Sequence, residues 1–414
     1  MTETSKQLTT SVRVRLSAMM FLQYLFFAVW FVPLAAYLTN MGVEGWKKAI
    51  ILSSMPLGCL VSPIVCMFAD RHFAGQKVLI VLNVACALLF FVAARASTPI
   101  ILFASLLAAM FCYMPTWNLT NAIAMANCPS DKFPQIRSLG SVGWVAALLY
   151  SVVALKLFGK EIDGTTIPLY CGAATALVAA IFGLTLPNTP PPAKGKPASV
   201  VDALGLRAMG LMKEFNFAAF IILSMLMMVP FTMYFSLGSQ FFQNQGFKLV
   251  TATMNWGQFV EMFVMLLVPL SLARLGIKWT IMIGLAGLVV RYVMFYAGGL
   301  YDQTALYYGA ILIHGVIFSF FFVGGQVYVD KKAPAEMRAQ AQGLVGLIVF
   351  GIGWLAGNFF NVKLIDVYTT VGESGANVYD WNKIWMITTL ISLALLVAFW
   401  AVFRDDTKKA EAAA

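Results

Sequence analysis

The chain has 414 residues, of which 60% are hydrophobic and 11% are charged, whereas soluble domains carry about a quarter charged residues. So few charges cannot cover a soluble protein of this length, and the composition predicts a chain whose solvent is lipid. The formal net charge of +10 does not indicate a nucleic-acid partner, because the basic residues are spread thinly between apolar runs.

Apolar runs long enough to cross a bilayer, which takes roughly 20 residues, recur along the whole chain. The first run is too long for a signal-peptide core and lacks a convincing cleavage site, so we interpret it as a retained helix. The runs are also too long and continuous for a β-barrel. We predict an all-α polytopic membrane protein with twelve transmembrane helices at 17–39, 48–69, 77–95, 99–126, 137–158, 166–186, 216–243, 252–273, 279–299, 304–329, 339–368 and 383–403.

A polar stretch, Pro187–Glu214, separates the predicted helices into two sets of six. We therefore expect an N-terminal six-helix bundle over residues 1–186, a cytoplasmic linker over 187–214 and a C-terminal bundle over 215–414. Placing the N-terminus in the cytoplasm puts most of the loop lysines and arginines inside, which predicts that both termini are cytoplasmic.

The two halves echo each other weakly. GSVG at 140–143 follows Arg137, and GLVG at 343–346 follows Arg338 in the corresponding place of the second half. Parallel repeats of this kind are typical of two pseudo-symmetric bundles and predict a solute site between them, near the middle of the membrane.

Enzyme and cofactor motifs do not occur in the sequence. It has no P-loop, G-x-S-x-G elbow, H-E-x-x-H motif or acidic cluster suited to Mg²⁺. The six cysteines lie in or beside apolar runs without metal-ligand spacing. We expect no enzyme activity, no cofactor and no metal, so that transport uses an ion gradient or passive flow.

Glu261 alone among the 18 acidic residues lies in the middle of an apolar span. Gln258 precedes it by three positions and so shares its helix face. A buried carboxyl changes protonation with its surroundings, which is the physical requirement for coupling transport to protons. The alternative is a carboxyl bonded to a neighbouring helix and kept for packing.

Arg137 opens the fifth predicted helix, with Ser141 and Trp144 four and seven positions on. An arginine, a hydroxyl and an aromatic ring on one face suit a polar ring solute. The alternative for Arg137 is a cytoplasmic anchor that extends to the membrane surface. Arg291 has no comparable polar stripe, so we interpret it as a structural pairing residue.

Uncharged polar and aromatic residues in four other spans are further candidates, although each is equally suited to joining helices. His314 is the exception, because a single histidine in an aromatic-rich span more often has only a structural hydrogen bond. The candidates are Gln23 and Trp30 in helix one, Tyr113, Thr116, Asn118, Thr120 and Asn121 in helix four, Thr232, Tyr234, Ser236, Ser239 and Gln240 in helix seven, and His314, Ser319 and Gln326 in helix ten.

Several long motifs are similar to those of a known family. They are Asp70-Arg71 after helix two, YMPTWNLTNAI (113–123), FPQIRSLGSVG (133–143), Gln258-x-x-Glu261 followed by LSLARLGIK (270–278), and VYVDKKAPAEMRAQAQG (327–343). Over nearly its whole length the chain resembles the bacterial nucleoside:H⁺ symporter family of the major facilitator superfamily.

The resemblance implies a proton-driven nucleoside importer that works by alternating access. It implies a solute site made by Arg137, Ser141, Trp144, Gln258, Glu261 and Phe318, to which we add Gln23, Trp30, Asn121, Thr232 and Ser319. Glu261, with Arg137, would couple transport to protons, and Asp70, Arg71, Arg274 and Arg338 would form a cytoplasmic gate. The alternative for these four is topology alone.

Three positions depart from the family's pattern. Known nucleoside carriers of the family have an acidic residue after the helix-ten aromatic, where this chain has Ser319, and amides in helix seven, where it has Thr232 and Phe235. A symporter or facilitator for a sugar or nucleobase therefore stays open, as does a non-transporting solute receptor. We expect a small-molecule substrate, a lipid surround, no nucleic acid and a monomer.

Overall fold

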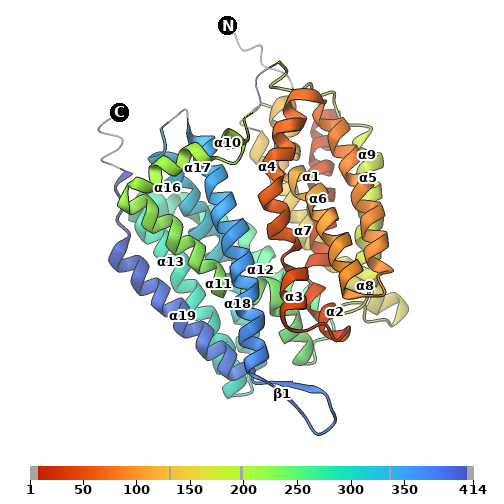
Figure 1. Cartoon of the computed structure of the whole chain (residues 1–414), viewed down its shortest axis with the longest axis vertical. Coiled ribbons are helices and arrows are strands. Elements are labelled where there is room, and N and C mark those ends of the chain that lie inside the picture. The colour runs from red at the N-terminus through yellow and green to blue at the C-terminus, as the bar shows by residue number, and fades with distance from the viewer. Residues whose placement is uncertain (1–7, 130–131, 196–198, 335–336, 408–414) are drawn as a thin grey trace. The chain divides into compact units, whose positions relative to one another are not determined.

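The computed structural model describes residues 8–129, 132–195, 199–334 and 337–407 (Figure 1). Over these residues the chain is mainly helical, and the expected all-α, multi-pass fold is confirmed. The extreme termini lie outside the described residues, as do Lys6, Lys196, Lys408 and Lys409 of the predicted cytoplasmic charge. The side of the membrane on which the termini lie therefore stays a prediction.

The chain forms two compact units. The domain boundaries at residues 186 and 214 that the sequence suggests stay a prediction. Unit 1 contains Met1–Gly42, Ser54–Val200 and Gly246–Ala252, and unit 2 contains Val43–Ser53, Val201–Gln245 and Thr253–Ala414.

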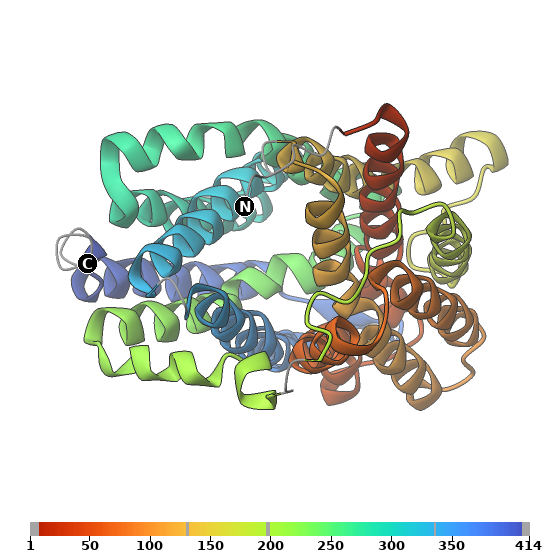
Figure 2. The same ribbon diagram turned by 90° about the horizontal axis from the view of Figure 1, so that it is seen from above.

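Unit 1 is a helix bundle in which α1 packs against α7 and α9, and α5 packs against α6 and α9 (Figure 2). A cluster of buried apolar side chains, including Leu16, Leu79, Ile123 and Ile136, joins α1, α5, α6 and α7. Its helices are α1 (Thr10–Phe31), α2 (Leu34–Asn40), α4 (Ser54–His72), α5 (Gly75–Ala94), α6 (Pro99–Asn127), α7 (Phe133–Ala146), α8 (Leu148–Phe158) and α9 (Ile167–Gly183), with α10 (Val200–Ala203) at its boundary.

Short local signals set several of these helix ends. The hydroxyl of Thr9 accepts from the Val12 amide and caps α1, and Thr98 caps α6 in the same way. Gly159 ends α8 with φ +63°, a left-handed conformation that glycine adopts without a Cβ clash. The first predicted helix is divided at Pro33, between α1 and α2, because proline has no amide hydrogen to continue the ladder.

In unit 2 α19 packs against both α13 and α11 (Figure 1), and α18 packs against α11 and α3. The elements are α3 (Gly45–Leu52), η1 (Leu206–Lys213), α11 (Phe215–Asn244), α12 (Val250–Val264, whose first residues belong to unit 1), η2 (Met265–Leu267), α13 (Val268–Leu300), α14 (Thr304–Leu312), α15 (His314–Val316), the π-helical turn η3 (Ile317–Val323), α16 (Gly324–Lys332), α17 (Arg338–Val345), the π-helical turn η5 (Gly346–Gly353), α18 (Trp354–Val367), strands β1 (Thr369–Val371) and β2 (Asn377–Tyr379), and α19 (Trp381–Val402).

All twelve predicted spans fall on helices. Within the described residues, ten helical stretches are long and apolar enough to cross a membrane. The number is ten because predicted spans eight and nine run together over Val250–Leu300 and the sixth is the shorter Ile167–Gly183. Spans eight and nine still change direction at Gly276, whose φ of +80° and ψ of 177° are non-helical.

The sequence analysis did not predict the β-hairpin that follows α18. β1 pairs with β2 in antiparallel register, with Thr369 opposite Tyr379. Only three residues on each side pair, so the alternation on which strand prediction depends is too short to read.

Candidate functional site

The predicted stripe on α7 lies on one unbroken helix in unit 1. Arg137 and Ser141 are partly exposed, and Trp144 is buried against the ring of Phe27, with centroids 5.4 Å apart. The structure therefore places the arginine, hydroxyl and indole on one helix, as the spacing predicted. Whether they bind a solute stays a prediction.

The Arg137 side chain rests on an aromatic residue that the sequence analysis missed. Its guanidinium carbon lies 4.4 Å from the centroid of the Tyr24 ring, a cation–π distance. The Tyr24 ring in turn stacks on Trp117 of α6, with centroids 5.9 Å apart and planes at 9°. Tyr24 is one residue after Gln23, but nothing in the sequence places it against α7.

Gln23 is held in a buried hydrogen-bond network. Its amide donates to Asn83 Oδ1 over 2.9 Å and accepts from Thr116 Oγ1 over 3.0 Å, while Tyr113 donates to its backbone carbonyl. Only 1% of Gln23 is exposed. The structure thus places this predicted solute-binding side chain among α1, α5 and α6, where it joins the helices.

Trp30 and Asn121 lie away from the α7 stripe. Trp30 is buried against the rings of Phe27, Phe31 and Phe90. Asn121 is partly buried on α6, and its Oδ1 has no hydrogen-bond partner among the described residues. The structure does not bring either residue into contact with Arg137.

In unit 2 a histidine stands between the two residues that the sequence paired. His314 Nε2 lies 2.9 Å from Gln258 Nε2 and 3.6 Å from Glu261 Oε2. All three side chains lie at the contact of α12 with α15, and Glu261 is 7% exposed. The sequence analysis flagged His314 only as a polar residue in an aromatic span, because the helical repeat cannot show which neighbouring helix it faces.

Phe318 and Ser319 occupy the π-helical turn η3. The Phe318 ring is partly exposed and lies 6.1 Å from the His314 ring. Ser319 is fully buried, with no hydrogen-bond partner for its Oγ among the described residues. The structure therefore groups Phe318 with Gln258 and Glu261 through His314, but not Ser319.

The helix-seven positions are engaged in packing. Asn361 donates to Thr232 Oγ1 over 2.9 Å, which ties α11 to α18. The Phe235 ring packs on His314 and on Trp354, with centroids 5.8 and 5.3 Å away. Thr232 is fully buried and is not brought to the Gln258 group.

Arg291 is fully buried, and no carboxylate of the described residues is hydrogen-bonded to it. Its Nε donates to the Ala310 carbonyl over 3.1 Å, and its guanidinium lies 4.1 Å from the centroid of the Tyr234 ring. The expected structural role thus takes the form of a cation–π contact and one backbone hydrogen bond.

The four predicted gate residues lie at helix ends. Arg71 donates to the Met67 carbonyl on its own helix, and Arg338 lies 3.8 Å from Asp330 in an exposed ion pair. Arg274 is exposed beside Gly276, and the backbone carbonyl of Asp70 accepts from the Ala193 amide. A gate between the units stays a prediction.

The sequence analysis did not predict a charged cluster around Lys332. Lys332 lies 2.5 Å from Glu214 and 2.9 Å from Asp406, and Asn216 also donates to Asp406. The cluster ties α16 to the start of α11 and to the residues after α19. These groups are distant in sequence, so no spacing rule predicts their contact.

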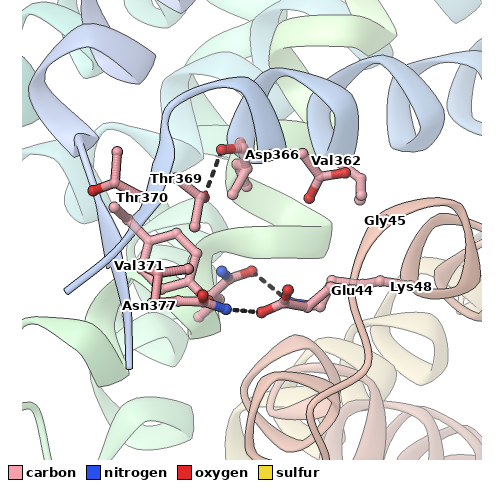
Figure 3. Close-up of a pocket in the computed structure, with 12 residues that line it drawn as sticks. Glu44, Gly45, Lys48, Val362, Asp366, Thr369, Thr370, Val371 and Asn377 are labelled. Atoms are coloured by element: carbon pink, nitrogen blue, oxygen red, sulfur yellow. Dashed lines mark hydrogen bonds between the residues drawn. The ribbon is translucent and has the colours of Figure 1, made fainter. Parts of the chain in front are cut away.

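A cavity of about 460 Å³ lies in unit 2 beside the hairpin (Figure 3). Lys48, which donates to Gln240 over 3.1 Å, lines it together with Glu44 and Asp366. Figure 3 shows Glu44 and Asn377 pointing toward each other, joined by a hydrogen bond. Gln240, one of the helix-seven candidates, lines this cavity, whereas Arg137, Gln258, Glu261 and Phe318 do not.

Comparison with known proteins identifies the family and the fold. The model of the family described as Nucleoside H+ symporter matches residues 10–408. YegT of Escherichia coli (strain K12) is 35% identical over 399 residues, which cover 95% of this chain and 94% of that protein.

Nucleoside permease NupG of the same strain is 28% identical over 413 residues, covering 95% of this chain and 96% of NupG. The crystal structure of nucleoside transporter NupG superposes with a TM-score of 0.83 at 27% identity, covering 95% of this chain and 99% of that one. The chain has the major facilitator fold and belongs to the nucleoside H⁺ symporter family.

Proposed function

We propose that this chain imports nucleosides together with protons by alternating access. Family membership supports the substrate class and the proton, and the names of NupG and its crystal structure point to nucleosides. We place the protein in a bacterial inner membrane as a monomer with both termini cytoplasmic. It transports without chemical conversion and without a cofactor, and the proton gradient drives it.

The burial of the Glu261 carboxyl is the observation that supports proton coupling. This carboxyl is buried within an apolar stretch, and its neighbours across the helix contact are His314 and the aromatic residues around it. Ionising a carboxyl at this depth is costly, so its proton affinity changes when the surroundings open or close. In this proposal Glu261 takes up a proton on the outside and releases it on the inside.

The two units contribute separate sets of solute-binding residues. Unit 1 supplies Arg137, Ser141 and Trp144, with Tyr24 supporting the guanidinium. Unit 2 supplies Gln258 and Phe318. The arginine and amide suit ribose hydroxyls and base carbonyls, and the indole and phenyl rings suit the flat base. Asp70, Arg71, Arg274 and Arg338 act as the cytoplasmic gate.

Uptake into proteoliposomes tests the function. Radiolabelled uridine and adenosine are supplied with and without an inward proton gradient, in competition with glucose, xylose and nucleobases. Accumulation that requires the gradient supports the proposal. Nucleoside uptake that only equilibrates and does not respond to the gradient would identify the chain as a passive facilitator. Uptake of a sugar or nucleobase alone would show that the substrate is not a nucleoside.

Glu261→Gln tests the coupling residue directly. The amide has the shape of the protonated carboxyl but cannot titrate. We expect the variant to bind and exchange nucleoside but to lose accumulation against a gradient. Full gradient-driven, pH-dependent accumulation by this variant would contradict the role of Glu261.

A further inference from the structure

Two glycines bring the backbone of α12 against the α14–α15 segment. A Cβ at Gly257 would lie 2.8 Å from the Ile311 carbonyl oxygen and 2.9 Å from His314 Cβ. A Cβ at Gly315 would lie 2.8 Å from both the amide nitrogen and the Cα of Glu261. These distances leave no room for side chains, so the backbones themselves hold His314 opposite Gln258 and Glu261.

The His314 ring is also enclosed by other rings. Phe231, Tyr234, Phe235 and Phe318 have centroids between 5.8 and 6.3 Å from that of His314, which is 1% exposed. This packing restricts the ring to the orientation in which Nε2 faces α12. Its Nδ1 has no hydrogen-bond partner among the described residues.

The atom Nε2 has room for one strong hydrogen bond and has two neighbours that compete for it. The Gln258 amide nitrogen, placed 2.9 Å away, can only donate, so in this arrangement Nε2 accepts and the ring proton sits on Nδ1. Glu261 Oε2 lies at 3.6 Å, beyond hydrogen-bond distance. An ionised carboxylate can only accept, and an accepting Nε2 offers it no proton.

Protonation of Glu261 changes this competition. The carboxylic acid carries an O–H, which is a stronger donor than an amide N–H and stands beside the same acceptor atom. We infer that His314 is a positioning residue that couples the proton on Glu261 to the Gln258 amide. The protonated Glu261 carboxyl donates to His314 Nε2 in place of the Gln258 amide, and Gln258 is released to bind the solute. The inference rests on the proposed nucleoside symport.

The proton balance of this exchange involves Glu261 alone. One proton enters on the Glu261 carboxylate and later leaves from it, while His314 keeps its single proton on Nδ1 throughout. The charged and titratable groups that face the ring are Glu261 from α12, Arg291 from α13 and Tyr234 from α11. By linkage, a proton that strengthens solute binding is itself bound more tightly when the solute is present.

The test is the pH dependence of uridine affinity, measured with radiolabelled uridine on the purified full chain. For wild type we expect affinity to fall as pH rises, by at most about tenfold per pH unit for one linked proton. His314→Phe fits the aromatic surround but has no acceptor, so Gln258 is always released. This variant should bind uridine with an affinity that no longer changes with pH.

A conservative variant and a matched control separate this role from general packing. His314→Gln restores an acceptor oxygen and should recover part of the pH dependence. His72→Phe makes the same change at the exposed histidine that ends α4 and should keep the wild-type profile. If His314→Phe does not purify as a monodisperse protein, His314→Met replaces it with the same expectation.

The outcomes are distinct from those that test the function. Wild type that binds no nucleoside at any pH would refute the proposed substrate. Wild type with pH-dependent binding, together with a His314→Phe variant that keeps the full dependence, would overturn the role of His314 and leave the function standing.

Discussion

Gly143→Ala tests whether the α7 stripe depends on direct backbone contact between α1 and α7. A Cβ at this position would strike the Phe21 carbonyl oxygen and would lie 2.8 Å from its carbonyl carbon and 2.9 Å from its Cα. Restoring ordinary contact requires the two helices to separate by at least about 0.6 Å, because backbone atoms cannot rotate away.

We expect this overpacking to cost about 1–3 kcal/mol. The same displacement moves Trp144 away from Phe27 and Arg137 away from Tyr24, so nucleoside uptake should also fall. The melting temperature of the protein in detergent measures the first effect, and proteoliposome uptake measures the second.

The second half of the chain supplies the control. Gly346 occupies the repeat position that corresponds to Gly143, but a Cβ there would meet no described atom within 4 Å. Gly346→Ala should leave the melting temperature unchanged or raise it, since alanine is favoured over glycine in a helix by about 0.5–1 kcal/mol. If Gly143→Ala melted and transported like Gly346→Ala, the close α1–α7 contact would be refuted.

Three further predictions concern groups outside the solute-binding sets. Asp163→Ala should lower the melting temperature, because the Thr251 amide, the Thr251 hydroxyl and the Ser151 hydroxyl would each lose their acceptor. Leaving such buried donors unpaired costs about 1–3 kcal/mol. Asp163→Asn should cost less, and equal melting temperatures of the two variants would contradict this account. Partial burial raises the pKa of Asp406, but hydrogen bonds from Lys332 and Asn216 outweigh it and leave the pKa below its ordinary value. The stability contributed by Asp406 is therefore present above the ordinary aspartate pKa and is lost as pH falls through the lowered pKa. Lys332→Met should show a smaller acid-induced fall in melting temperature than wild type. An unchanged fall would argue against the cluster. Asp70→Asn should slow uptake while leaving uridine affinity close to wild type, and a large loss of affinity would rule out a purely gating role.

The sequence alone was sufficient for the helices, their order and the family. Long apolar runs need lipid and must be helical there, whatever their neighbours, and the Arg137–Ser141–Trp144 stripe follows from the helical repeat within one segment. For the same reason Glu261 could be identified from its position within an apolar span, before its contacts were known.

Contacts between helices were decided only by the tertiary structure. GSVG and GLVG look alike in the sequence, yet a Cβ added at Gly143 would strike the Phe21 backbone, whereas one added at Gly346 would meet no described atom within 4 Å. Gln23 and Thr232 carry polar groups that could bind a solute. In the structure Gln23 is hydrogen-bonded to Asn83 and Thr116, and Thr232 accepts from Asn361. A helical repeat determines which residues share a face, whereas the rotation and spacing of the helices determine what that face meets. Those two quantities depend on the packing of all helices in a unit, which is why His314 between Gln258 and Glu261 became visible only in the folded chain.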